Sequence, residues 1–125
     1  MKPVKAHHMS FPVKDLDKSQ AFYRDILGLE QIPRPDIFPV PGLWFQAGAC
    51  EVHLIQVEEG FDVGEPPKTT NPIARHAAFA IDDYDETLAF LKDTGLTVFE
   101  TNADVGQMWI ADPDGHVIEL IKPAS

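Results

Sequence analysis

Four side chains with metal-binding chemistry stand far apart in the sequence, namely His8, His53, His76 and Glu119. Three neutral imidazoles and one carboxylate suit Zn, Ni, Co, Mn or Fe(II), and they leave coordination positions open for water or substrate. An isolated carboxylate is costly to bury, so a bound cation gives Glu119 a physical reason to lie on an apolar strand face. We predict that these residues bind one divalent transition metal. A lone strand histidine is more often a hydrogen-bonded structural group, and His53 could instead act as a base or line a pocket.

An internal repeat favours the metal interpretation. Residues 8–22, HMSFPVKDLDKSQAF, align without a gap with residues 76–90, HAAFAIDDYDETLAF, and six of the fifteen positions are identical. Chance would give roughly one identity, so we infer a duplication. The alignment continues with small gaps and matches Trp44 with Trp109. It pairs His8 with His76 and His53 with Glu119, so the candidate ligands occupy equivalent positions in the two copies.

Each copy predicts the order strand, helix and three strands. The signals are alternating apolar residues, Asp caps, and Gly28 or Gly95 at the helix ends. We expect the first helix to point Ala21, Phe22 and Ile26 inward. The expected strands of the first copy are 8–13, 29–32, 43–47 and 51–56, and those of the second are 76–81, 96–100, 107–111 and 117–121. The second helix is expected at 85–94, and Asp112–Gly115 predicts a sharp turn.

These elements predict an α+β fold class. We expect a single domain over residues 1–125, with one module at about 5–57, a linker at 58–74 and a second module at about 75–122. The two βαβββ modules would form a curved mixed sheet around a metal and substrate cavity. Strand alternation separates each histidine from the apolar core set, and the small neighbours of His76, Ala78 and Ala80, leave space on its face.

Composition limits the possible partners. Hydrophobic residues make up 44% of the 125 and charged residues 24%, which is typical of a globular protein. The formal charge of −10 disfavours binding to nucleic acid or anionic lipid, and no apolar run approaches the roughly 20 residues of a membrane span. Cys50 is the single cysteine, so no intrachain disulfide is possible. We expect a cytoplasmic protein that acts on a small molecule.

Four longer segments carry a resemblance to a known family. The chain resembles the vicinal oxygen chelate superfamily, which includes glyoxalase I, bleomycin-resistance proteins, fosfomycin-resistance transferases and extradiol dioxygenases. The resemblance implies a glyoxalase-like fold, a homodimer with sites assembled from both chains, and His8, His76 and Glu119 as metal ligands. His53 falls where glyoxalase I has a metal-binding glutamate that also moves protons. The segments are HMSFPVKDL with FYRDILGL, HAAFAIDD, and DPDGHVIEL.

Functional hypotheses follow from the ligand set and the resemblance together. The leading one is a lyase or isomerase of the glyoxalase type, in which two neighbouring substrate oxygens chelate the metal, with His53 and Glu119 catalytic. One alternative is an Fe(II) ring-cleaving dioxygenase, and another is a non-catalytic protein that binds an antibiotic or toxin. The residues expected to contact substrate are Phe38, Trp44 or Phe45, Met108 or Trp109, and the two guanidinium groups of Arg34 and Arg75, which could hold a carboxylate or phosphate.

Overall fold

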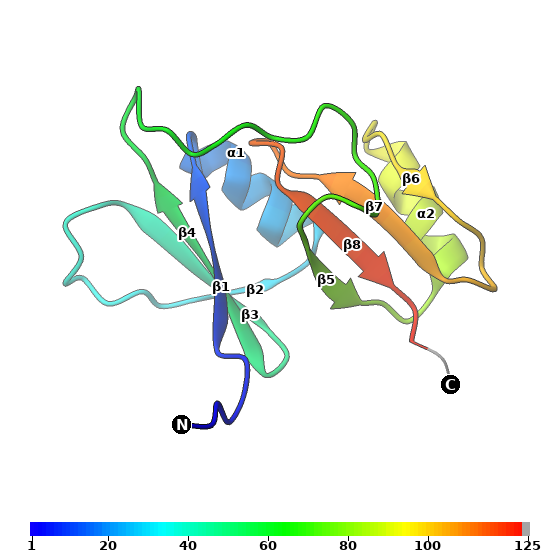
Figure 1. Ribbon diagram of the computed structural model, residues 1–125, viewed down its shortest axis with the longest axis horizontal. Helices are drawn as coiled ribbons and strands as arrows, with labels where there is room; N and C mark the ends of the chain where they lie inside the picture. The colour runs from blue at the N-terminus through cyan, green and yellow to red at the C-terminus, as the bar shows by residue number, and fades with distance from the viewer. Residues whose placement is uncertain (124–125) are drawn as a thin grey trace. The chain divides into compact units, whose positions relative to one another are not determined.

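The computed structural model describes residues 1–123 (Figure 1). The chain divides into two compact units, one of residues Met1–Gly64 and the other from Glu65 onward. Each unit contains a four-stranded mixed sheet and a helical segment, in the order that the duplicated sequence predicts. The α+β fold class is therefore confirmed. No helix within residues 1–123 is long and apolar enough to cross a membrane.

The first unit places its helical segment against one face of its sheet. The sheet order is β1-β4-β3-β2, with β1 parallel to β4 and the other pairs antiparallel. The ring of Tyr23 lies 6.1 Å from the rings of both Phe11 and Phe45, so the helical segment covers the face that holds these residues. The elements are β1 (His8–Val13), α1 (Leu16–Gln20), π-helix η1 (Ala21–Ile26), β2 (Glu30–Ile32), β3 (Gly42–Ala47) and β4 (Cys50–Gln56).

The first helix differs from the prediction in its inward face. Asp15 caps it by accepting from the backbone N–H groups of Asp17 and Lys18. Further along, the N–H of Leu27 donates to the carbonyl of Phe22 at 2.9 Å, which is the five-residue spacing of a π-helix. The wider turn buries Phe22 and Tyr23 and leaves Ala21 exposed. The expectation that Ala21 points inward is therefore wrong.

The second unit repeats this plan with the sheet order β5-β8-β7-β6. Asp83 caps α2 by accepting from the N–H of Glu86, and Gly95, at φ 84°, follows its last turn. The N–H of Gly115 donates to the carbonyl of Asp112 at 3.0 Å, which closes the turn predicted before the last strand. The elements are β5 (His76–Ala80), α2 (Tyr84–Asp93), β6 (Phe99–Glu100), β7 (Gln107–Ala111) and β8 (Val117–Ile121).

Strand alternation in β4 yields a matched stability prediction. Leu54 is fully buried in the core, whereas its neighbour Ile55 points to the opposite face and is 38% exposed. Leu54→Ala is expected to lower the free energy of unfolding by about 2–5 kcal/mol through the cavity it leaves, and Ile55→Ala by less than about 1.5 kcal/mol. Chemical denaturation of both variants measures the difference. A larger loss in Ile55→Ala than in Leu54→Ala would contradict the register of β4, because a one-residue slip exchanges the two faces.

Candidate metal centre

His76 and Glu119 lie side by side on one face of the second sheet. β5 runs parallel to β8 with Ala78 opposite Glu119, so His76 occupies the diagonal position on the same face. The Nε2 atom of His76 lies 3.8 Å from Oε1 of Glu119. Glu119 is only 7% exposed. Two ligand atoms that are each about 2.1 Å from one ion are separated by about 3–4 Å, so this spacing fits a shared metal.

A backbone hydrogen bond selects the tautomer of the neutral His76 ring. Its Nδ1 lies 2.6 Å from the carbonyl oxygen of Ala74. A carbonyl oxygen only accepts, so Nδ1 must carry the hydrogen, and in the neutral ring Nε2 then carries the lone pair. A ligating histidine typically has such a bond on its other nitrogen. The donor chemistry of His76 therefore fits a metal, with Nε2 as the ligating atom.

Two further side chains surround this pair. The side-chain amide of Gln107 donates to Oε1 of Glu119 at 3.4 Å, so it holds the carboxylate in place. Trp109 pairs with Glu119 across β7 and β8, and its ring meets that of His76 edge to face at a centroid distance of 6.5 Å. Gln107 was not among the residues that we singled out from the sequence. Once β7 and β8 are paired, alternation places it on the Glu119 face.

His8 and His53 occupy the equivalent positions in the first unit. β1 runs parallel to β4 with Ser10 opposite His53, so His8 is again diagonal to its partner. The two rings stack at a centroid distance of 4.1 Å and an interplanar angle of 16°. The indole of Trp44 covers the other face of His53 at 4.1 Å and 5°. His53 is thus clamped between two rings, and it is only 8% exposed.

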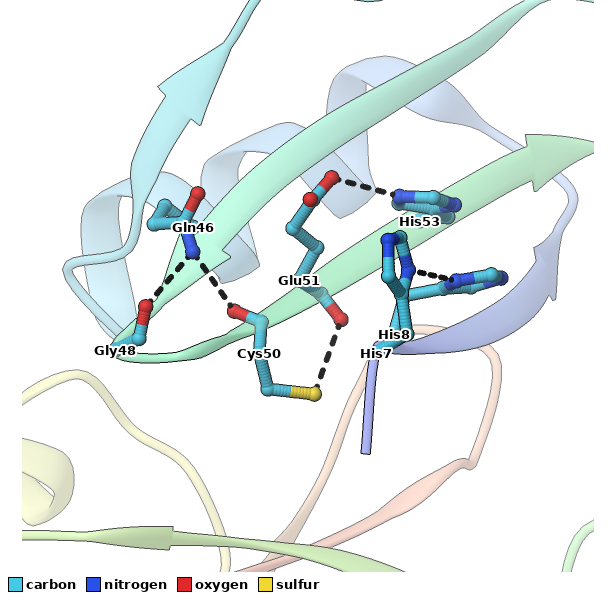
Figure 2. Close-up of polar contacts among 7 residues, drawn as sticks. All are labelled: His7, His8, Gln46, Gly48, Cys50, Glu51 and His53. Carbon is cyan, nitrogen blue, oxygen red and sulfur yellow. Dashed lines mark hydrogen bonds and ion pairs between the residues drawn. The ribbon is translucent and has the colours of Figure 1, made fainter. Parts of the chain in front are cut away.

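The stacked geometry does not suit two ligands of one ion. Imidazole lone pairs lie in the ring plane, so nearly parallel rings 4.1 Å apart do not point at a common atom. The Nε2 atom of His53 is also 3.1 Å from Oε1 of Glu51 (Figure 2). This hydrogen bond is the main cause of the lowered pKa of Glu51, and burial of the carboxylate acts in the opposite direction. His53 therefore fits a proton-transfer role better than the predicted ligand role.

His8 retains one nitrogen for a metal. Its Nδ1 lies 2.8 Å from Nδ1 of His7 (Figure 2). When His8 is the donor in this contact, its Nε2 holds the lone pair that could ligate. This contact was not predicted, because strand alternation separates adjacent side chains, and His7 precedes β1. Within residues 1–123, no group of three or more His, Cys, Asp and Glu side chains that could hold a metal is found. The structure thus brings together the pairs His8 with His53 and His76 with Glu119.

The candidate substrate residues of the first unit lie on β3 and on the loop that precedes it. Trp44 covers His53, and the ring of Phe38 lies 6.0 Å from that of Trp44. Arg34 is held within the same loop, since it donates to the carbonyl of Val40 at 2.9 Å and lies over the Phe38 ring at 4.8 Å. These contacts hold Arg34 within the loop in this structure, although its buried Nε has no hydrogen-bond partner among the described residues, so we do not assign Arg34 to a substrate anion.

The remaining candidates divide between the two sheet faces. Phe45 and Met108 are fully buried and pair with Val52 and Leu120, on the faces opposite to His53 and Glu119. They are core residues, which leaves the other member of each predicted alternative, Trp44 and Trp109, on the candidate faces. Arg75 is exposed and immediately precedes His76.

Comparison with known proteins identifies the family. Residues 5–120 match the model of the Glyoxalase/Bleomycin resistance protein/Dioxygenase superfamily. The chain belongs to this superfamily. The match covers both copies of the repeat, so the resemblance seen in the sequence is confirmed.

Individual known proteins are similar to this chain along most of their length. Glyoxylase I 4 of Arabidopsis thaliana is 29% identical over 120 residues, which are 91% of this chain and 68% of that protein. Glutathione transferase FosA of Serratia marcescens is 30% identical over 117 residues, 91% of this chain and 77% of that protein. The crystal structure of a glyoxalase family protein from Bacillus anthracis superposes with a TM-score of 0.79 at 27% identity, covering 99% and 98% of the two chains.

Proposed function

We propose that this glyoxalase superfamily member is a metal-dependent enzyme of the lyase or isomerase type. Its substrate would present two neighbouring oxygens to a divalent transition metal. The observation that supports this most is the His76 and Glu119 pair, in which a fixed Nε2 lone pair faces a buried carboxylate at 3.8 Å. The similarity to proteins named glyoxylase I and glutathione transferase agrees with an enzyme that acts on a small molecule.

We assign a chemical role to the bound ion and to each side chain around it. A bound divalent ion supplies Lewis-acid stabilisation of a substrate oxyanion. His76 and Glu119 would hold the ion, with His8 as a further ligand through Nε2. His53 would accept a proton from the carbon next to the substrate carbonyl, while the electron pair moves to the carbonyl oxygen. Gln107, which donates to the Glu119 carboxylate, would keep it oriented as a ligand.

Each unit also offers contacts for the remainder of the substrate. Phe38, at 43% exposure, and Trp44 together present aromatic surface beside His53. We assign this surface to an apolar substituent. Arg75 is the exposed guanidinium next to the metal-binding histidine, and we assign it to a substrate carboxylate or phosphate. Trp109 is assigned to the same substrate side as His76.

The resemblance also implies a homodimer. Light scattering on the purified protein should give twice the chain mass of 13.9 kDa. A monomer at micromolar concentration would contradict this proposal without affecting the assignment of His76 and Glu119, which lie together in the second unit.

The reaction class can be tested by metal reconstitution. Apoprotein loaded in turn with Ni, Co, Zn and Fe(II) would be assayed on α-oxo aldehyde thiol adducts and on catechols, with oxygen consumption followed. We expect oxygen-independent turnover of an adduct with Ni, Co or Zn. Oxygen-dependent catechol cleavage with Fe(II) would instead support the dioxygenase alternative. Tight binding of a small molecule that persists in chelator, with no turnover by any metal form, would support a binding protein.

A further inference from the structure

A carboxylate lies beside His53 in the first unit and has no counterpart in the second. Glu51 and His53 share one face of β4, and Oε1 of Glu51 lies 3.1 Å from Nε2 of His53 (Figure 2). Their side chains are 23% and 10% exposed. In the register of the sheets, Glu51 is opposite His8 in the same way that Val117 is opposite His76. The duplicated scaffold therefore holds an apolar residue where the first copy has an acid.

We propose that Glu51 is a positioning residue that makes His53 a proton acceptor instead of a metal ligand. This inference rests on the proposed function. A carboxylate only accepts hydrogen bonds, so Nε2 of His53 must carry a hydrogen, and in the neutral ring Nδ1 then holds the lone pair. The base nitrogen is thereby defined as Nδ1. When Nδ1 takes the substrate proton, the charge on the imidazolium lies next to the Glu51 carboxylate, which offsets it.

The aromatic contacts of His53 complete the orientation. His8 and Trp44 lie on its two faces at 4.1 Å each, so the ring is confined to one plane. The hydrogen bond to Glu51 then determines which ring nitrogen faces the carboxylate within that plane. Stacking alone would not distinguish the two flipped orientations of the ring, because the neighbouring rings contact its faces and not its nitrogens.

In their neutral forms, His53 and His76 are held in opposite tautomers. The Nδ1–H of His76 donates to the carbonyl of Ala74, which leaves Nε2 for a metal. The Nε2–H of His53 donates to Glu51, which leaves Nδ1 for a proton. We infer that these two histidines differ in role, so that His76 would bind the ion through Nε2 and His53 would take up a proton at Nδ1.

Nitrogen-15 NMR of the histidine rings tests this directly. The chain has five histidines, so long-range proton to nitrogen-15 spectra of the metal-free protein are simple enough to assign, with His53→Ala identifying one ring. At a pH where the rings are neutral, His53 should show the Nε2–H tautomer. Glu51→Val, which introduces the residue found at the equivalent position of the second unit, should shift it to a mixture or to the Nδ1–H form. Glu51→Gln keeps an accepting oxygen and should retain most of the original tautomer.

Metal titration of the same proteins separates this inference from the proposed function. Calorimetry with Zn²⁺ should give Glu51→Val and Glu51→Gln an affinity within about threefold of the wild type. A loss of Zn²⁺ affinity of tenfold or more in Glu51→Gln, which retains the acceptor, would show that Glu51 helps to bind the ion and would overturn the inference. An unchanged His53 tautomer in Glu51→Val would also overturn it. If the wild type binds no metal while the tautomer shift is observed, the proposed function fails and the positioning by Glu51 stands.

Discussion

Replacing His76 with alanine is expected to weaken divalent-metal binding by at least about 100-fold, more than the 10- to 100-fold typical of losing a residue that only supports a ligand. The variant removes the Nε2 lone pair that faces Glu119 and leaves the carboxylate without its partner. Glu119→Gln should have a comparable effect, because a neutral amide no longer offsets the charge of the ion. Titration of the apoprotein with Zn²⁺ or Co²⁺ by calorimetry measures both.

Matched controls distinguish a ligand from a general loss of charge or imidazole. Glu100→Gln removes a carboxylate from the same unit, where it forms an exposed ion pair with Lys92 at 2.7 Å. His116→Ala removes an imidazole three residues from Glu119. We expect both controls to bind metal within about threefold of the wild type. If the controls lose as much affinity as His76→Ala, the assignment of the His76 and Glu119 pair is wrong.

Removing the metal with a chelator is expected to lower thermal stability substantially. A ligand that binds only the folded state stabilises it by about 2.7 kcal/mol when its free concentration is 100 times the dissociation constant. For a chain of 125 residues this corresponds to a fall in Tm of roughly 10 °C when the ion is removed. Differential scanning calorimetry with and without metal measures the change. His76→Ala should show no difference between the two conditions, and a similar shift in that variant would indicate binding elsewhere.

The strands and the two residue pairs follow closely from the sequence. The repeat aligns His8 with His76, and alternation assigns each to the face away from the core. Parallel pairing of the first and last strands of each unit then sets His8 diagonal to His53 and His76 diagonal to Glu119. These features depend on local periodicity and on the duplication, and both can be detected in a single sequence.

Other features depend on contacts that no sequence pattern specifies. The π-helical segment, which includes the backbone hydrogen bond between Leu27 and Phe22, has no distinct signal in the sequence pattern. The capture of Arg34 by Val40 and Phe38 depends on how the loop folds back on itself. The hydrogen bond between Glu51 and His53 could have been predicted, because residues two apart in a strand share a face. The role of His53 as a base instead of a ligand could be inferred only from the stacked geometry of its ring.

Elemental analysis tests the central claim most directly, namely that His76 and Glu119 hold a divalent metal. Wild-type protein and His76→Ala would be reconstituted side by side, passed through a desalting column and measured for metal content. We predict about one equivalent of a divalent transition metal per chain in the wild type and less than about 0.1 in the variant. A wild type that retains less than about 0.1 equivalent of any transition metal after reconstitution would contradict the account.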